Sequence, residues 1–221
     1  YPSKESVVKA NSILTSVDDA SFGEIAKSVS FALWEGDEEE LNNLCLQYQS
    51  TDSEVQNKLH IGNEIRNDKG YYFGSAFYYE KELYWGLDRL HYLEDRLTYL
   101  GLRNNSNNES VCQLELKAPA KLTSAKKVNL YFYPSLNSPY TFVSAKRVRE
   151  MQDEYPINLI TQPVLPMLMR KMTIPGVKGK YIISDAAREG RKHGYEMKSI
   201  YSPIGKPARK AYSLFPIING G

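Results

Sequence analysis

Cysteine is scarce in this chain: only Cys45 and Cys112 occur among its 221 residues, and neither belongs to a C-x-x-C motif. This scarcity excludes a sequence-evident zinc site and an internal redox dithiol. It is also typical of a reducing compartment, so we expect a cytoplasmic protein. The three histidines are isolated from one another and show no metal-ligand spacing, so we expect no metal site.

Charge of one sign and long apolar runs are lacking as well. The 28 basic residues nearly balance 26 acidic ones, so the basic footprint of a nucleic-acid-binding protein is absent. No run reaches the roughly 18 apolar residues of a membrane span, and we expect neither nucleic acid nor a membrane as partner. An initiating Met and a signal segment are also missing, which predicts a processed or excerpted chain. The hydrophobic fraction of 42% and the mean hydropathy of −0.49 are typical of a globular protein.

The first part of the chain has a helical pattern. Apolar residues recur at helical spacing from Phe22 onward, and Gly36 ends the pattern. A second helix is expected from Glu38, because acidic residues suit the positive end of the helix dipole. A polar stretch at 49–58 then precedes a short apolar segment at 59–65. The apolar side of the second helix is expected to comprise Leu41, Leu44 and Leu46.

Residues 71–101 change to a strand pattern followed by a helix. Bulky residues at 71–79, a charged turn at 80–82 and the apolar Leu83-Tyr84-Trp85 predict a β-hairpin. A helix is expected to begin near Leu87 and to end at Gly101.

A linker and a second structured part follow. Residues 102–127, rich in Asn, Ser and Lys, predict the linker, in which Val111–Leu116 alternates like an edge strand. In 128–162 a strand, a helix and a second strand predict a parallel β-α-β unit, because the crossover is long enough for parallel strands. Helices are expected again near 180–193 and after Pro207.

The junction between the first strand and the helix of this unit carries the chemical information. Ser138 stands at the N-cap position and Pro139 in the first turn. A helix N-terminus has unpaired N–H groups and the positive dipole end, so it stabilises a thiolate or another anion. Ser138 cannot form a disulfide, but its hydroxyl can donate a hydrogen bond to a bound thiolate. The alternative is that Ser138 only caps its helix.

These residues resemble the DsbA-like thioredoxin superfamily, in the branch of 2-hydroxychromene-2-carboxylate isomerases and kappa-class glutathione transferases. That branch has Ser where the oxidoreductases have the first Cys of C-P-x-C. The resemblance implies that Ser138 is the catalytic residue, and that Pro139, Tyr140 and Lys178 contact bound glutathione. The matching residues are Ser138-Pro139-Tyr140-Thr141, Pro163 to Met167, Lys178, Tyr181, Asp185, Arg188 and Leu214-Phe215-Pro216. The alternative for the four residues from Lys178 to Arg188 is an exposed, salt-bridged helix face.

The segment Leu83–Leu90 resembles the other end of the same domain, with the family's G-x-D-R-L pattern. In the family this turn contacts the γ-glutamyl part of glutathione, so Asp88 and Arg89 are expected to bind glutathione. Asp88 is expected to pair with the ammonium group of the γ-glutamyl part. The alternative is that Asp88 caps the helix and Arg89 is its surface partner. The family's cis-Pro has no counterpart in Gly74-Ser75-Ala76.

The expected fold class is α/β: a thioredoxin-like fold with an all-helical insertion and its halves in inverted order. Residues 1–101 resemble the C-terminal half of such a domain, 102–127 the linker, and 128–221 the N-terminal half. Two arrangements stay open, an excerpt of a tandem protein and a permuted or cut single domain.

The function implied by the resemblance is that of a glutathione-dependent isomerase or transferase. Glutathione is then a co-substrate, and the expected partner is a small-molecule substrate. A homodimer, with a second copy of the chain, is a further possible assembly. The alternative is a domain related to the thiol-disulfide oxidoreductases that lacks C-x-x-C, has lost catalysis and serves for binding or dimerisation.

Overall fold

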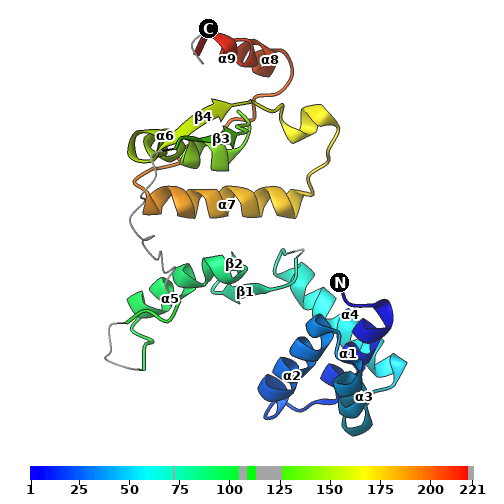
Figure 1. Ribbon diagram of the computed structural model, residues 1–221. Helices are drawn as coiled ribbons and strands as arrows, with labels where there is room; N and C mark the ends of the chain where they lie inside the picture. The colour runs from blue at the N-terminus through cyan, green and yellow to red at the C-terminus, as the bar shows by residue number, and fades with distance from the viewer. Residues whose placement is uncertain (72, 105–108, 113–125, 219–221) are drawn as a thin grey trace. The chain divides into compact units, whose positions relative to one another are not determined.

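The computed structural model describes residues 1–71, 73–104, 109–112 and 126–218 (Figure 1). Its contacts divide the chain into two compact units, Tyr1–Gly70 and Tyr71–Gly221. Helices and two small sheets occur together, so the expected mixed α/β class is confirmed. Among the described residues, no helix combines the length and the apolar character needed to cross a membrane.

The first unit is built from helices, and side-chain caps mark where α1, α3 and α4 begin. Its elements are α1 (Lys4–Ser16), α2 (Phe22–Glu35), α3 (Glu38–Gln47) and α4 (Asp52–Asp68). Asp37 caps α3 by accepting a hydrogen bond from the Glu40 N–H, and Thr51 and Glu54 form a capping box at the start of α4. Gly36 ends α2 with a φ of 76°, a left-handed conformation that glycine adopts without strain.

The core of this unit lies between α1, α2 and α3. Ile13 and Leu41 are fully buried. The other buried members of the cluster are Ala10, Val17, Val29, Ala32 and Leu44. The expected apolar side of α3 is wrong at Leu46, whose exposed fraction is 87%, because positions 41 and 44 share a helix face and position 46 does not.

The separation of residues 49–58 from 59–65 is also wrong, because both belong to the continuous helix α4. The capping box at Thr51 starts this helix, and Val55 is its buried residue. Polar side chains dominate the rest of α4 because most of its surface is exposed. The polar composition therefore indicated exposure rather than a loop.

Leu41 and Leu46 allow a matched test of this core. Leu41→Ala is expected to lower the free energy of unfolding of the first unit by about 2–5 kcal/mol, because it leaves a cavity at a fully buried position. Leu46→Ala, in the same helix, is expected to change it by less than about 0.5 kcal/mol. Urea unfolding followed by circular dichroism measures both, and equal losses would contradict the assigned core.

The second unit begins with the expected β-hairpin. Strands β1 (Ala76–Tyr79) and β2 (Glu82–Trp85) pair antiparallel, with Phe77 opposite Tyr84. The two turn residues, Glu80 and Lys81, have φ values of 44° and 69°, as a tight two-residue hairpin turn requires. The helical segment after the hairpin is confirmed as the short 3-10 helix η1 (Leu87–Arg89) followed by α5 (Leu90–Tyr99), and Gly101 has a φ of 71°.

The predicted β-α-β unit is confirmed. Strands β3 (Val128–Phe132) and β4 (Ile157–Thr161) pair in parallel, and α6 (Pro139–Glu154) connects them. The chain continues through η2 (Met167–Arg170), α7 (Gly176–Lys192), α8 (Lys206–Tyr212) and α9 (Phe215–Ile218).

Helices α6 and α7 pack against each other (Figure 1). A Cβ atom on Gly190 of α7 would lie 3.1 Å from the Tyr195 carbonyl oxygen and 3.6 Å from a methyl group of the buried Val143 in α6. The tight contact is the one with the Tyr195 carbonyl oxygen, so the missing side chain at Gly190 lets the chain after α7 approach closely, whereas 3.6 Å from Val143 is ordinary van der Waals contact.

Parts of the predicted linker lie outside the described residues, including most of the expected edge strand Val111–Leu116. Its two described residues, Val111 and Cys112, form a turn. The assignment of 1–101 and 128–221 to the two halves of a domain stays a prediction.

The segment after α5 is held by the carboxylate of Glu94. This group accepts hydrogen bonds from the backbone N–H groups of Val111 and Cys112, each at 2.7 Å, and from the Ser110 hydroxyl. Arg103 donates to it at 3.3 Å. The hydrogen bond from Ser110 and then those from the two backbone amides lower the pKa of Glu94 from 4.5 to about 2.

This shift predicts a pH dependence of stability. Because the pKa of Glu94 is lowered in the folded chain, its contribution is fully present above pH 4.5 and is lost as the pH falls toward 2. We expect the free energy of unfolding of the wild type to decline more steeply over this range than that of Glu94→Gln. Glu109→Gln, which removes an exposed carboxylate nearby, is the control and should follow the wild type. Parallel curves for all three proteins would contradict the role of Glu94.

Candidate functional site

The N-terminus of α6 has the geometry that the sequence predicted. Ser138 is the N-cap residue, and its Oγ accepts a hydrogen bond from the Thr141 N–H at 3.3 Å. Pro139 occupies the first turn, where its missing N–H costs nothing. The preceding loop is fixed by two more bonds, from the Ser138 N–H to the Ser135 carbonyl oxygen at 2.9 Å and from the Ser135 N–H to Thr141 Oγ1 at 3.1 Å.

A surface pocket of about 220 Å³ adjoins this helix end. Residues 136–139 and Phe142 form one wall, and residues 196–201 form the other. Phe142, Ile200 and Tyr201 give it apolar surface. Lys198 gives it a positive charge, with its ammonium group 3.2 Å from the Glu196 carboxylate and both side chains exposed. The pocket therefore combines an exposed Lys198–Glu196 ion pair, an apolar wall and a helix N-terminus.

The Ser138 hydroxyl can donate a hydrogen bond while it caps the helix. Its oxygen accepts the capping bond, and within the described part of the chain its hydrogen has no acceptor. A hydroxyl can accept and donate at the same time, so capping and the binding of an anion are compatible. Because Pro139 has no N–H, Tyr140 supplies the first backbone amide of the helix. The arrangement can hold a small anion or a thiolate at the positive end of α6.

A buried ionic cluster lies elsewhere in the same unit, around Asp185 of α7. The exposed fraction of Asp185 is 1%. Arg89 of η1 donates to its carboxylate through Nε and Nη2, both at 3.0 Å, and Tyr140 of α6 donates through its hydroxyl at 2.7 Å. Tyr181 donates at 3.3 Å, and an Arg188 nitrogen lies 3.7 Å away. One carboxylate thus joins η1, α6 and α7.

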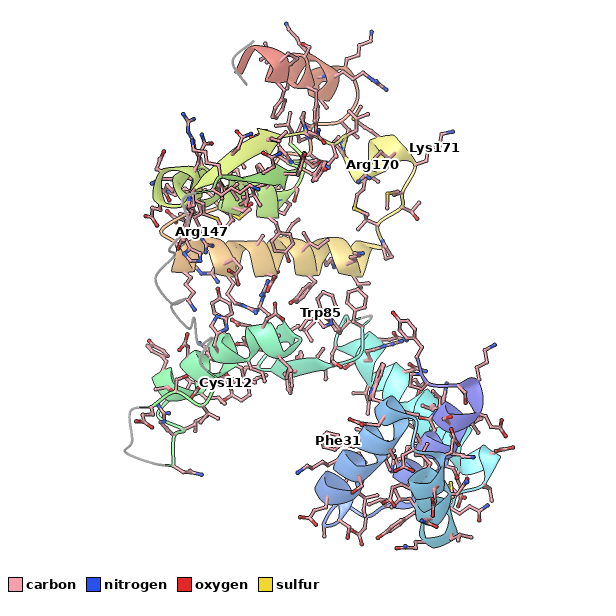
Figure 2. All side chains as sticks on the ribbon, viewed as in Figure 1. Phe31, Trp85, Cys112, Arg147, Arg170 and Lys171 are labelled. Atoms are coloured by element: carbon pink, nitrogen blue, oxygen red, sulfur yellow. The ribbon has the colours of Figure 1, made fainter. Side chains whose placement is uncertain are left out.

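This cluster corrects the expectation of an exposed, salt-bridged face on α7. Tyr181 and Asp185 are buried, because the hairpin packs there: the Tyr181 hydroxyl accepts a hydrogen bond from the Trp85 N–H at 3.3 Å, and Arg188 donates to the Leu83 carbonyl oxygen at 2.9 Å. Trp85, the last residue of β2, lies on the side of the hairpin that faces α7 (Figure 2), where its ring contacts that of Tyr181 edge-to-face. Burial and the nearby Asp185 charge raise the pKa of Tyr181 to about 12.

The residues expected to bind glutathione are divided between different places. Ser138 and Pro139 line the pocket. Tyr140 and Arg89 bind Asp185, so the idea that Arg89 is only a surface partner is wrong. Burial, followed by the hydrogen bond to Asp185, raises the pKa of the Tyr140 hydroxyl.

Asp88 and Lys178 are not among the residues that line this pocket. Asp88 lies inside η1 and accepts a hydrogen bond from Arg89 Nη1 at 2.6 Å, with 65% of its side chain exposed. It does not cap α5, whose N-cap residue is Arg89, so that alternative is wrong. The Lys178 ammonium group lies 5.9 Å from the centroid of the Phe73 ring, a cation–π contact.

Two parts of the site were not predicted. The segment 196–201 carries no motif, so nothing in the sequence indicated that it lines the pocket. Asp185 was marked by its spacing from Tyr181, but its burial depends on Arg89, 96 residues away. Within the described residues, no three His, Cys, Asp or Glu side chains are grouped so as to hold a metal ion.

The comparisons with known proteins find no match for this chain, whether with family models, curated proteins or solved structures.

Proposed function

We propose that this chain is a glutathione-dependent isomerase or transferase of the 2-hydroxychromene-2-carboxylate isomerase type, with a thioredoxin-like arrangement of its β-α-β and hairpin elements. The observation that carries the proposal is Ser138: a capping oxygen with an unused hydroxyl hydrogen, at the N-terminus of a 16-residue helix and beside a pocket. The resemblance of the Ser138-Pro139-Tyr140-Thr141 junction to that family supports it.

In this proposal the pocket holds glutathione as a thiolate. The Ser138 hydroxyl donates a hydrogen bond to the sulfur, and the positive end of α6 stabilises its negative charge. Lys198 offers a positive charge to a carboxylate of the tripeptide, which then replaces the Glu196 carboxylate as its partner. These contacts lower the pKa of the thiol, so that more of it is nucleophilic at neutral pH.

The reaction follows from this nucleophile. The thiolate attacks an electrophilic carbon of the substrate, forming a carbon–sulfur bond while an electron pair moves onto the substrate. In an isomerisation the bond breaks after rearrangement and the thiolate leaves unchanged. In a transfer the displaced electron pair takes up a proton or departs with a leaving group, and the conjugate is released. The apolar surface of Phe142, Ile200 and Tyr201 favours an aromatic or hydrophobic substrate.

Arg89 and Tyr140 take a different part from the one the resemblance implied. Both donate hydrogen bonds to the buried Asp185 carboxylate. We therefore propose that they hold the elements around the site in place and do not contact glutathione. Asp88 and Lys178 stay candidates for binding, although Asp88 already pairs with Arg89.

Variants of Ser138 test the proposal. Ser138→Ala removes one charge-assisted hydrogen bond of about 1.5–3 kcal/mol, so the pKa of bound glutathione is expected to rise by about 1–2 units. The ultraviolet absorbance of the thiolate against pH measures this shift. Ser138→Thr keeps cap and donor and should resemble the wild type. Ser138→Asp keeps a capping oxygen, removes the donor and adds a negative charge, so it should raise the thiol pKa by more than Ser138→Ala does.

Two controls separate binding of the thiolate from other effects. Ser199→Ala removes a hydroxyl from the other wall of the pocket and should leave the thiol pKa unchanged. S-methylglutathione has no thiolate, so its affinity should not depend on the Ser138 hydroxyl. If the wild type binds no glutathione at millimolar concentration, the proposal fails. If Ser138→Ala lowers only the melting temperature, Ser138 is a helix cap alone.

A non-catalytic binding or dimerisation module is the second candidate, and the backbone near Ser75 favours it. Gly74-Ser75-Ala76 contains no proline, and Ser75 has a φ of 56°. In the family that the chain resembles, a cis-Pro at this place contacts the peptide backbone of glutathione. A wild type that forms a dimer in analytical ultracentrifugation and does not bind glutathione would favour this candidate.

The redox alternative predicts a different activity. Cys45 and Cys112 lie in different compact units, and burial followed by the charge of Glu94 raises the pKa of the Cys112 thiol, which disfavours a reactive thiolate. We therefore expect no dithiothreitol-dependent reduction of insulin disulfides above background. Turnover that is lost in Cys45→Ser or Cys112→Ser would overturn this expectation.

A further inference from the structure

We infer that Asp185 is a positioning residue: through Tyr140 it fixes the first turn of α6, which carries Ser138, and through Arg89 it ties that turn to η1. The relevance of this link to glutathione rests on the proposed function. The link itself rests only on the contacts around the carboxylate.

Both oxygens of the Asp185 carboxylate are used. Oδ1 accepts from Arg89 Nε at 3.0 Å and from the Tyr181 hydroxyl at 3.3 Å. Oδ2 accepts from Arg89 Nη2 at 3.0 Å and from the Tyr140 hydroxyl at 2.7 Å. A buried carboxylate requires such partners because removing a charge from water costs free energy. Loss of one partner should therefore destabilise the whole cluster.

Tyr140 is the member that reaches the pocket end of α6. It lies two residues after Ser138, in the first turn, and first turns open more readily than the middle of a helix. Its hydroxyl is held by a charged acceptor, and such hydrogen bonds are among the stronger ones. The orientation of the turn, and with it the direction of the Ser138 hydroxyl, therefore depends on Asp185.

Arg89 extends the same constraint to η1. Its planar guanidinium group binds Asp185 through two nitrogens, and a third nitrogen binds Asp88. A lysine cannot reproduce this fork. One carboxylate binds both Arg89 and Tyr140. A substitution at Arg89 should therefore loosen the N-terminus of α6, although the two are far apart in sequence.

Hydrogen exchange in the full chain tests the link. The critical variant is Tyr140→Phe, which removes one hydroxyl and preserves the ion pair between Arg89 and Asp185. The amides of Thr141 and Phe142, bonded to Ser138 Oγ and its carbonyl oxygen, should exchange roughly 10–100-fold faster. The amide of Tyr155, at the other end of α6, should be unaffected. Tyr133→Phe, at an exposed tyrosine of the same unit, is the control.

Arg89→Lys should produce the same local effect, because it weakens the fork on Asp185. Acceleration confined to the first turn in both variants supports the inference. Uniform acceleration throughout α6 would indicate general destabilisation and overturn it, as would no change at Thr141 and Phe142.

The thiol pKa of bound glutathione gives a second measurement. If Asp185 positions Ser138 for the thiolate, Tyr140→Phe should raise that pKa, and adding Tyr140→Phe to Ser138→Ala should change the pKa little beyond Ser138→Ala alone. A fully additive effect would overturn the coupling to Ser138. If the wild type does not bind glutathione, the proposed function fails, while hydrogen exchange still decides whether Asp185 positions the turn.

Discussion

The buried carboxylate of Asp185 is the constraint on which the second unit depends. Desolvation of a charge is costly unless opposite charge and hydrogen bonds replace the lost water, and here Arg89, Tyr140 and Tyr181 provide them. These partners come from three helical elements, so satisfying one group brings η1, α6 and α7 together. The parallel β-α-β unit and the hairpin segment share a compact unit, and this cluster is a specific contact between them.

Ser138 does not contact Asp185 itself, but it lies in the same helical turn as Tyr140, which does. The first turn of α6 begins with Ser138-Pro139 in the pocket wall and continues with Tyr140 bound to Asp185. A single hydroxyl on Ser138 then serves two purposes, because its oxygen closes the helix end and its hydrogen stays available. The same geometry that stabilises the helix therefore presents a donor at its positive end.

The structure places Ser138 and Pro139 in the wall of the pocket and Arg89 on the buried carboxylate of Asp185. The family pattern implied that Arg89 contacts glutathione, whereas the geometry engages its planar group with a buried carboxylate. A guanidinium group binds any carboxylate in the same way, so Arg89 could in principle bind either a carboxylate of glutathione or the carboxylate of a side chain. Here the acceptor belongs to the chain itself. Lys198 and the apolar side chains at 200 and 201 complete the pocket, and they lie in a segment without any motif.

The sequence by itself determined features that arise from neighbouring residues: the end of α2 at Gly36, the hairpin turn, the parallel β-α-β unit and the Ser138-Pro139 helix start. Caps and turns involve residues within a few positions, so local patterns predict them. Local patterns also contained the start of α4, in the capping box at Thr51 and Glu54, and the exposure of Leu46, in its helical spacing from Leu41 and Leu44, although both were predicted wrongly. Only the tertiary structure decided that Asp185 is buried rather than on an open face. That outcome depends on a partner 96 residues away, and no local pattern of charge or hydrophobicity contains that information.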